Sequence, residues 1–167
     1  MKTADFIREH NACREGAEWA LSVSDDMADV WDALIKEGKH GWLLWVVTRP
    51  GVVSAPTLRR LACRFIRETP VGGGKTVWDL LTDARSRKAV EVSEAYADGK
   101  ATEAELDAAW AAADAVARTS ADAAARAAAR SAERAVCFAA SSYTAARSAQ
   151  IKMIAELGNP FKEEMVK

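Results

Sequence analysis

The chain has 167 residues, of which 50% are hydrophobic and 28% charged, and its formal net charge is −1. This composition excludes an intrinsically disordered chain, and the near-neutral charge gives no general attraction to nucleic acid. No segment has the ~20 consecutive apolar residues of a membrane span, and the start, MKTADFIREH, carries charges where a signal peptide is apolar, so we expect a cytoplasmic protein with no membrane partner.

The N-terminal residues predict two helices. The first starts at Thr3 or Asp5 and runs toward Val23, and Gly16 is the expected place for a kink or a break because glycine disfavours a helix interior. Ser24 is expected to cap the second helix, since the acidic sequence DDMAD that follows suits a helix N-terminus.

A buried helix and an amphipathic helix are expected next. Gly38 would end the helix before them. Residues 40–51, HGWLLWVVTRPG, are apolar on every side and predict a central, fully buried helix ended by Pro50, with a buried strand as the alternative. Ser54 and Pro56 mark the start of the amphipathic helix. Its apolar face contains Leu58, Leu61, Ala62, Phe65 and Ile66, up to Pro70.

The glycine-rich segment VGGG at 71–74 predicts a loop. Thr76 and Asp79 have the spacing of a capping box, in which side chains and backbone N–H groups bond reciprocally. They predict a helix over 77–98, closed by Gly99.

Alanine dominates the C-terminal part of the chain: 23 of the 49 residues at 101–149 are alanine, and 101–157 contains no glycine or proline. Alanine loses no side-chain entropy in a helix, so this run predicts helix, with Thr102 and Glu105 as a capping box at its start. A single helix over 101–157 would be about 84 Å long, roughly twice the diameter of a compact domain of this size. The run must therefore break or protrude.

The best place for the break is Thr119–Ser120, where Ser120 can cap the helix that follows, and Ser141–Ser142 is a weaker candidate. Asn159–Pro160 would end the last helix. These elements predict an all-α fold: a single-domain helical bundle of about six to eight helices with a long alanine-rich C-terminal helical hairpin. The expected extents are 1–158 for the domain, 1–70 for its tryptophan-rich short helices, 76–157 for its long alanine-rich helices and 159–167 for a loose tail.

The sequence VGGGKT invites comparison with a phosphate-binding P-loop. Gly74, Lys75 and Thr76 match the end of the motif GxxxxGK followed by Ser or Thr, but Thr69 replaces its first glycine and a helix, not a strand, is expected before it. We therefore expect no nucleotide hydrolysis. The loop with Lys75 before a helix N-terminus could still bind an anion, and a plain flexible connector is the alternative.

Histidine and cysteine form no recognisable site. Cys13, Cys63 and Cys137 lack the CxxC spacing of metal and disulfide motifs, so reduced and mostly buried thiols are expected. His10 and Cys13 lie three residues apart, but no paired short-spacing motif supports a zinc site, and neither His10 nor His40 has a sequence-local partner that would make it a general base. We expect no metal, no cofactor and no catalytic residue.

The arginines form the most suggestive charged pattern. Arg118 and Arg126 each follow an aspartate by four residues, which predicts a solvated face of ion pairs. Other basic residues could line a cleft that binds phosphate groups or an acidic protein surface. This candidate anion or partner cleft consists of Arg60, Arg64, Arg67, Lys75, Arg130 and Arg134.

Six tryptophans are most simply residues of the core and its edge. One or two that stay exposed would mark a partner site, because tryptophan and arginine dominate interface hot spots. Trp42 and Trp45 are the candidate aromatic contacts.

Two blocks resemble known groups of proteins. Asn11-Ala12-Cys13 with Trp19, then Val30-Trp31 and WLLW at 42–45, resembles small helical proteins of phage and prophage genomes. AVEVSEAYADGKATEAELDAAWAAADAVA and the later AAARAAARSAERAV look like the alanine-rich core of immunity proteins from bacterial toxin–immunity systems. The resemblance implies a setting of phage–host conflict and carries over no site residue.

Our first functional hypothesis is a non-enzymatic, phage-type binding protein that neutralises a bacterial defence component or toxin by occupying its surface. Its partner would be a bacterial protein or defence complex. The alternative is a small-molecule binder that sequesters an anionic nucleotide signal in the arginine cleft. An alanine-rich helix with few large residues could also pair with its copy in a homodimer.

Overall fold

The computed structural model of the protein describes residues 1–113 and 140–162, with the backbone alone at 140–143. The described chain is mostly helical, with one two-stranded antiparallel sheet, so the predicted all-α class is confirmed. Its contacts form two compact units: unit 1 is Met1–Ser54 with Gln150–Lys167, and unit 2 is Ala55–Ala149. A single domain over 1–158 stays a prediction. No helix in the described residues has the length and apolar character of a membrane span.

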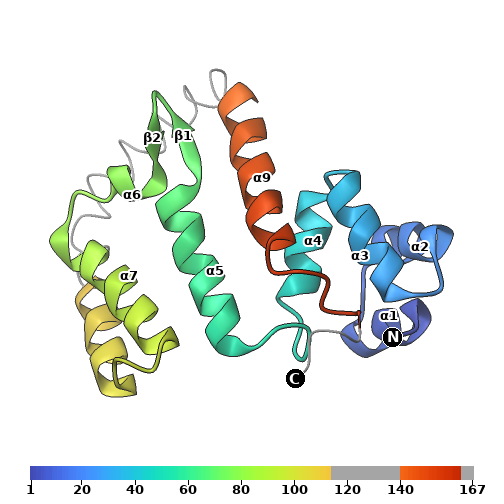
Figure 1. The fold of residues 1–167 in the computed structure, drawn as a ribbon, viewed down its shortest axis with the longest axis horizontal. Helices are drawn as coiled ribbons and strands as arrows, with labels where there is room; N and C mark the ends of the chain where they lie inside the picture. The colour runs from blue at the N-terminus through green and yellow to red at the C-terminus, as the bar shows by residue number, and fades with distance from the viewer. Residues whose placement is uncertain (114–139, 163–167) are drawn as a thin grey trace. The chain divides into compact units, whose positions relative to one another are not determined.

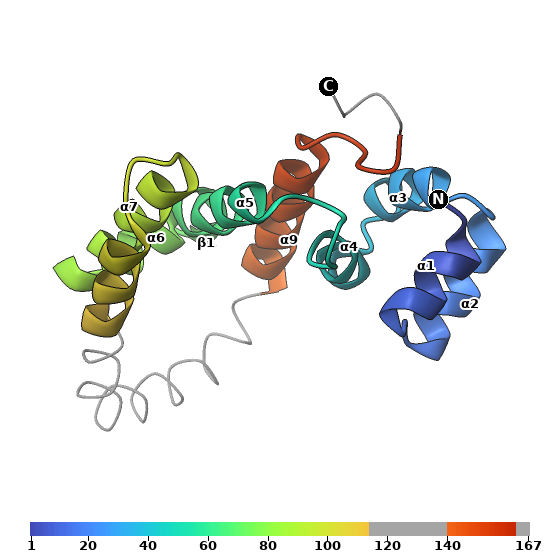
Figure 2. The ribbon, with the colours of Figure 1, turned by 90° about the horizontal axis from the view of Figure 1, so that it is seen from below.

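Four short helices begin unit 1 (Figure 1): α1 (Thr3–His10), α2 (Arg14–Val23), α3 (Met27–Lys36) and α4 (His40–Val47). Figure 2 shows α1 and α2 lying side by side, in agreement with their contacts.

The expected break in the first helix lies at Asn11, and the prediction of Gly16 was wrong. Asn11 has a φ of 51°, in the left-handed region that asparagine tolerates better than most residues. Its N–H still bonds to the carbonyl of Ile7, which closes α1. Gly16 instead lies inside α2.

The cap of α3 is Asp26, two residues after the predicted Ser24. The Asp26 carboxylate accepts a hydrogen bond from the N–H of Ala28, and the Ser24 hydroxyl supports it by accepting from the N–H of Asp26. Gly38 ends this helix region as predicted, because its φ of 66° suits glycine. The N–H of Lys39 then reaches back to the carbonyl of Leu34.

The apolar segment at 40–51 forms helix α4, so the alternative of a strand is wrong. The prediction of full burial is also wrong. An apolar run on a helix spreads around its whole circumference, and the short helices of unit 1 cover only part of that circumference. The buried side chains are Leu43, Val46 and Val47. Those of Trp42, Leu44 and Trp45 are half-buried.

The C-terminal residues 159–162 are anchored, so the loose tail predicted from residue 159 is wrong for them. The ring of Phe161 packs edge-on against Phe6 and Trp31, at centroid distances of 5.5 and 6.1 Å. The Asn159 amide donates to Asp32, and Lys162 pairs with the same carboxylate at 2.9 Å. Residues 163–167 lie outside the described residues.

Helix α9 (Ala140–Ala155) is continuous through Ser141–Ser142, so the weaker candidate break is wrong. The preferred break, Thr119–Ser120, lies outside the described residues. Helix α9 ends shortly before the predicted terminator Asn159–Pro160.

Unit 2 begins with α5 (Ala55–Glu68) and a small hairpin, β1 (Pro70–Gly72) paired with β2 (Lys75–Thr76). The predicted glycine loop is therefore the turn of a hairpin. Gly72, Gly73 and Gly74 all have positive φ, which glycine adopts without steric cost.

The helix predicted over 77–98 is two helices, α6 (Val77–Leu80) and α7 (Ala84–Ala97). Asp83 caps α7 by accepting from the N–H of Arg85, so the chain leaves helical geometry just before it. The capping box of Thr76 and Asp79 is confirmed at α6, as is the closing Gly99, with φ 69°.

Residues 103–113 form a further helix, which lies beside α7 in Figures 1 and 2. Its predicted capping box is confirmed: the Glu105 carboxylate accepts from the N–H and hydroxyl of Thr102, and the N–H of Glu105 donates to that hydroxyl.

Replacing Thr3 by valine is expected to raise the free energy of unfolding by about 1 kcal/mol. The Thr3 hydroxyl is fully buried and has no hydrogen-bond partner among the described residues, and valine has the same shape without the polar group. Urea unfolding followed by tryptophan fluorescence measures the change. Thr3→Ser, which keeps the hydroxyl and loses a methyl group, is expected to destabilise; a valine variant less stable than wild type would contradict this account.

Asp32→Asn is expected to lower stability slightly at pH 7 and to have no effect at pH 2. Lys162 and, to a lesser extent, Asn159 lower the pKa of Asp32 in the folded state. The carboxylate therefore stabilises the fold above its unfolded pKa, about 3.9, and this contribution disappears as the pH falls through the lower folded value. Urea midpoints of the two proteins at both pH values test this; an equal difference at both would refute it.

Candidate functional site

Three of the predicted cleft arginines lie on α5, and each is paired with a carboxylate of unit 2. The Arg60 guanidinium donates to the carboxylate of Asp98 at 2.9 Å and to the carbonyl of Ala97 at 2.7 Å. Arg64 donates through two nitrogens to Glu68, and this pairing lowers the pKa of Glu68.

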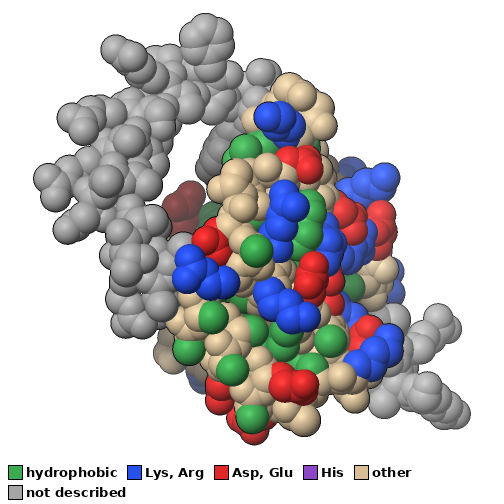
Figure 3. Space-filling view, turned by 90° about the vertical axis from the view of Figure 1, so that its left-hand side faces the viewer, with side chains coloured by type: hydrophobic (Ala, Val, Ile, Leu, Met, Phe, Trp, Pro, Cys, Tyr) green, Lys and Arg blue, Asp and Glu red, His purple; other side chains and the backbone are tan. Residues whose placement is uncertain are grey.

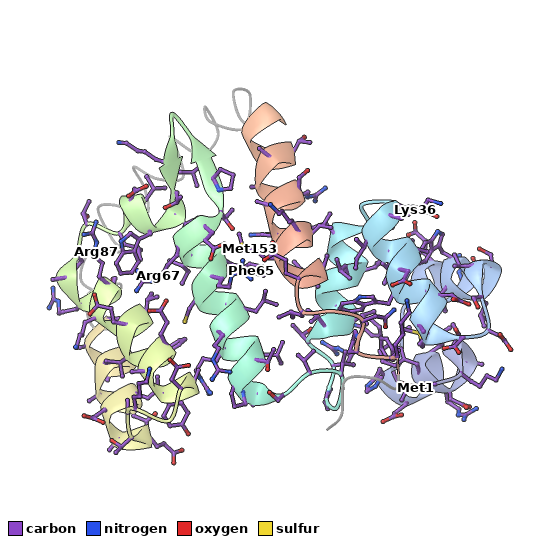
Figure 4. The ribbon with its side chains drawn as sticks, in the orientation of Figure 1. Met1, Lys36, Phe65, Arg67, Arg87 and Met153 are labelled. Carbon is purple, nitrogen blue, oxygen red and sulfur yellow. The ribbon has the colours of Figure 1, made fainter. Side chains whose placement is uncertain are left out.

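Arg67 is the most constrained arginine of the set. It forms a two-pronged ion pair with Glu94 of α7, which raises its pKa. Its guanidinium also lies 4.1 Å from the ring centroid of Trp78, and that of Arg87 lies 5.3 Å from the same ring. Figure 4 shows both arginines below α6, between α5 and α7. Arg67 thus connects α5, α6 and α7.

The face of α5 that carries Arg60 and Arg67 is directed at α7. The sequence analysis expected these arginines to line a basic cleft instead. Cys63, between them on the same face, is buried and donates from Sγ to the carbonyl of Val90 at 3.8 Å. In Figure 3, Lys and Arg side chains alternate with Asp and Glu on the described part of unit 2 facing the viewer. This mixture does not form the single-sign patch that attracts polyanions.

The candidate anion loop offers fewer donors than its sequence indicates. The Asp79 carboxylate already accepts from the N–H of Thr76 at 2.8 Å and from its hydroxyl at 3.2 Å. The Asp79 carboxylate therefore occupies the N-terminus of α6, where an external anion was expected to bind. Lys75 is exposed in the hairpin. Arg130 and Arg134 lie outside the described residues, so the six-residue cleft as a whole stays a prediction.

The two described cysteines differ in environment. Cys13 is exposed, contrary to the expected burial, whereas Cys63 is buried. Burial raises the pKa of the Cys63 thiol, and the nearby Glu94 carboxylate acts in the same direction. Within the described residues, no group of three or more His, Cys, Asp or Glu side chains could hold a metal ion.

Unit 1 contains an apolar hollow of about 270 Å³, which we name the tryptophan pocket. Cys13 and Gly41, which are exposed, lie at its mouth. Aromatic rings form its walls, and buried side chains of α3 form its floor. The walls contain Phe6, Trp19, Trp42 and Trp45, and the floor contains Met27, Val30 and Leu34.

Gly16 also lines the tryptophan pocket. A Cβ atom at this position would lie 3.3 Å from Cys13 Sγ and 3.7 Å from Trp42 Nε1. Such a Cβ atom would crowd the Cys13 sulfur but would make only an ordinary contact with the Trp42 indole, which therefore lies close to the backbone of α2. The candidate contacts Trp42 and Trp45 are thus brought together, in a concave site.

Two cations lie over the indole rings of this pocket. Lys39 Nζ is 5.6 Å from the centroid of Trp19 and 5.2 Å from that of Trp42. The Arg49 guanidinium is 4.9 Å from the Trp45 centroid, and its Nε donates to the Trp45 carbonyl. Sequence reasoning missed both residues, although Lys39 comes three residues before Trp42 and Arg49 four residues after Trp45, at the two ends of the apolar segment.

Unit 2 contains a second hollow, of about 360 Å³. Trp110 is its most prominent residue, with 61% of its surface exposed. The Trp110 Nε1 donates to the hydroxyl of Ser93 at 3.1 Å, and Arg59 lies 4.7 Å over the ring of Tyr96. We name this site the Trp110 surface and define it by six lining residues, Arg59, Ile66, Leu81, Val90, Ser93 and Trp110.

The sequence analysis did not single out Trp110 or Arg59 as contacts. The available signal was a lone tryptophan on a segment whose neighbours are nearly all alanine, which leaves little bulk to cover it.

No family model, curated protein or solved structure matches the chain.

Arg67→Ala is expected to destabilise the protein by about 1–2 kcal/mol after allowance for solvent screening, because it removes both the Glu94 pair and the contact with Trp78. Arg8→Ala, which removes an exposed pair with Asp5 on the same helix, is expected to cost about 0.5 kcal/mol or less. Urea unfolding of the two variants compares them. A loss for Arg67→Ala no greater than that for Arg8→Ala would contradict a structural role for Arg67.

Proposed function

We propose that this protein is a non-enzymatic binding protein that neutralises a protein partner by occupying its surface, and that the Trp110 surface is its contact site. The observation that carries the proposal is the exposed Trp110 ring at the edge of an apolar hollow. Tryptophan and arginine are the residues that most often dominate the energy of protein interfaces, and they act from well-packed pockets.

Both anchor side chains of the Trp110 surface are held before any partner arrives. The bond from Trp110 Nε1 to the Ser93 hydroxyl constrains the indole, and the Tyr96 ring supports the Arg59 guanidinium. A side chain that is already ordered loses less entropy on binding, so more of its contact energy contributes to affinity.

The chemistry of this surface favours occupancy over catalysis. The lining residues with potential nucleophiles are Cys63, Ser86 and Ser93. A raised pKa keeps the Cys63 thiol protonated and weakly reactive, and the Ser93 hydroxyl is engaged with the carbonyl of Ala89 and the indole of Trp110. Arg59 has no carboxylate partner among the described residues, so the matching partner surface would combine an apolar side chain with an acidic one.

The biological setting that we propose follows the resemblance to phage proteins and immunity proteins: the partner is a bacterial toxin or defence component inside the host cell. The alternative, sequestration of an anionic nucleotide, has less support, because Arg60, Arg64 and Arg67 each already hold a carboxylate.

The test is affinity capture with the full chain from lysates of bacteria that express toxins or defence systems, comparing wild type with Trp110→Ser. We expect a stoichiometric protein partner whose retention falls by tenfold or more in the variant, as loss of a hot spot predicts. Leu80→Ser is the matched control, since Leu80 is 56% exposed in unit 2 and does not line the hollow.

Circular dichroism of both variants establishes that they remain folded. Equal retention by Trp110→Ser and wild type would refute the Trp110 surface as the site. A capture in which no protein reaches stoichiometry in any tested lysate would argue against the function itself.

A further inference from the structure

We infer that the tryptophan pocket of unit 1 is a separate binding site for a small aromatic carboxylate, a flat ring system of up to two fused rings that carries an acid group. The residues that line it all belong to unit 1 and none belongs to the Trp110 surface. The inference therefore stands or falls independently of the proposed function.

The volume of the pocket limits the size of the ligand. An apolar cavity of about 150 Å³ holds one benzene ring, and this pocket has about 270 Å³. A system of two fused rings fits the ratio of these two volumes. Pockets for drug-sized ligands begin at about 300 Å³, so a larger ring system would extend into solvent.

The walls of the pocket favour an aromatic guest. Phe6 meets Trp45 edge-on at 6.0 Å, and Trp19 and Trp42 are tilted by 43° at 5.2 Å. A flat ring between such walls makes face and edge contacts that an aliphatic chain cannot reproduce. The floor residues Met27 and Leu34 are almost fully buried, so the guest would lose its contact with water there.

The charges at the pocket favour an acid over a neutral or cationic ligand. Lys39 immediately precedes α4 and Arg49 follows it, and each lies over a tryptophan ring of that helix, so a cation stands at each end of the tryptophan pair. A ligand cation would meet two like charges, although aromatic walls alone would suit it.

The Lys39 ammonium group is free to exchange partners. Its ion pair with Glu37 spans 3.8 Å, and both side chains are well exposed, so the pair is weak. The indole N–H of Trp42 has no hydrogen-bond partner among the described residues, which leaves a donor near the mouth of the pocket. A carboxylate held by Lys39 and this N–H would have its aromatic body inside the pocket.

The experiment is isothermal titration of the full chain with 2-naphthylacetate, its neutral amide and decanoate. We expect 2-naphthylacetate to bind at least fivefold more tightly than either of the other two probes. In Lys39→Met the preference for the acid over the amide is expected to disappear. Lys36→Met is the matched control, because Lys36 is exposed at the C-terminal end of α3 (Figure 4) and, unlike Lys39, does not lie over the Trp19 or Trp42 ring.

A second pair of variants tests the location. Ala20→Leu places a larger side chain in the pocket and is expected to abolish binding, whereas Ala17→Leu alters a residue of α2 that does not line the pocket and is expected to preserve it. Lys39→Met keeps a flexible side chain of similar length over the Trp19 and Trp42 rings and removes only its charge, so it decides the charge preference even where Ala20→Leu fails to fold.

Failure of all three probes to bind wild type would overturn the site. Equal affinity for acid and amide would overturn the assigned charge, and tighter binding of decanoate would overturn the aromatic class. Binding that survives in a folded Ala20→Leu would place the ligand elsewhere.

Discussion

Helices α1 to α4 contain only eight to ten residues each, a length at which a helix in water is marginal by itself. Burial of large side chains must therefore hold unit 1 together. Trp31 and Phe6 are almost fully buried, and Phe161 from the C-terminal segment covers both. Rigid indoles do not fill all the space between such short helices, which accounts physically for an apolar hollow beside a well-packed core.

Unit 2 depends more on charge. Its helices α5 and α7 face one another with arginines on the first and carboxylates on the second, and the Trp78 ring lies against two guanidinium groups. These pairs fix the position of one helix along the other, while the side chains of Arg60 and Arg67 stay partly exposed to water. The same pairing removes these arginines from the set available to an anionic ligand, so a basic helix face here is part of the protein's own packing.

The two proposed binding sites differ in the physical basis of recognition. The Trp110 surface presents an exposed ring and a supported cation, which suits a partner that buries them in its own surface. The tryptophan pocket is concave, with a buried floor and cations at its edge. This shape suits a small molecule that the protein can enclose. Tryptophan serves both sites because its large apolar area also carries a polar N–H group.

The sequence by itself determined the features that depend on residues a few positions apart. It located the turn at Gly38, the capping boxes of Thr76 and Thr102 and the stop at Gly99, because these need only local hydrogen bonds and a permitted φ angle. Only the tertiary structure decided which side of each helix is covered. Arg67 meets Glu94 across 27 residues, and Asn159 bonds to the carbonyl of Ala28 across 131. The half-burial of Trp42 and the exposure of Trp110 have the same origin, since no local pattern specifies which distant side chains will pack against a given face.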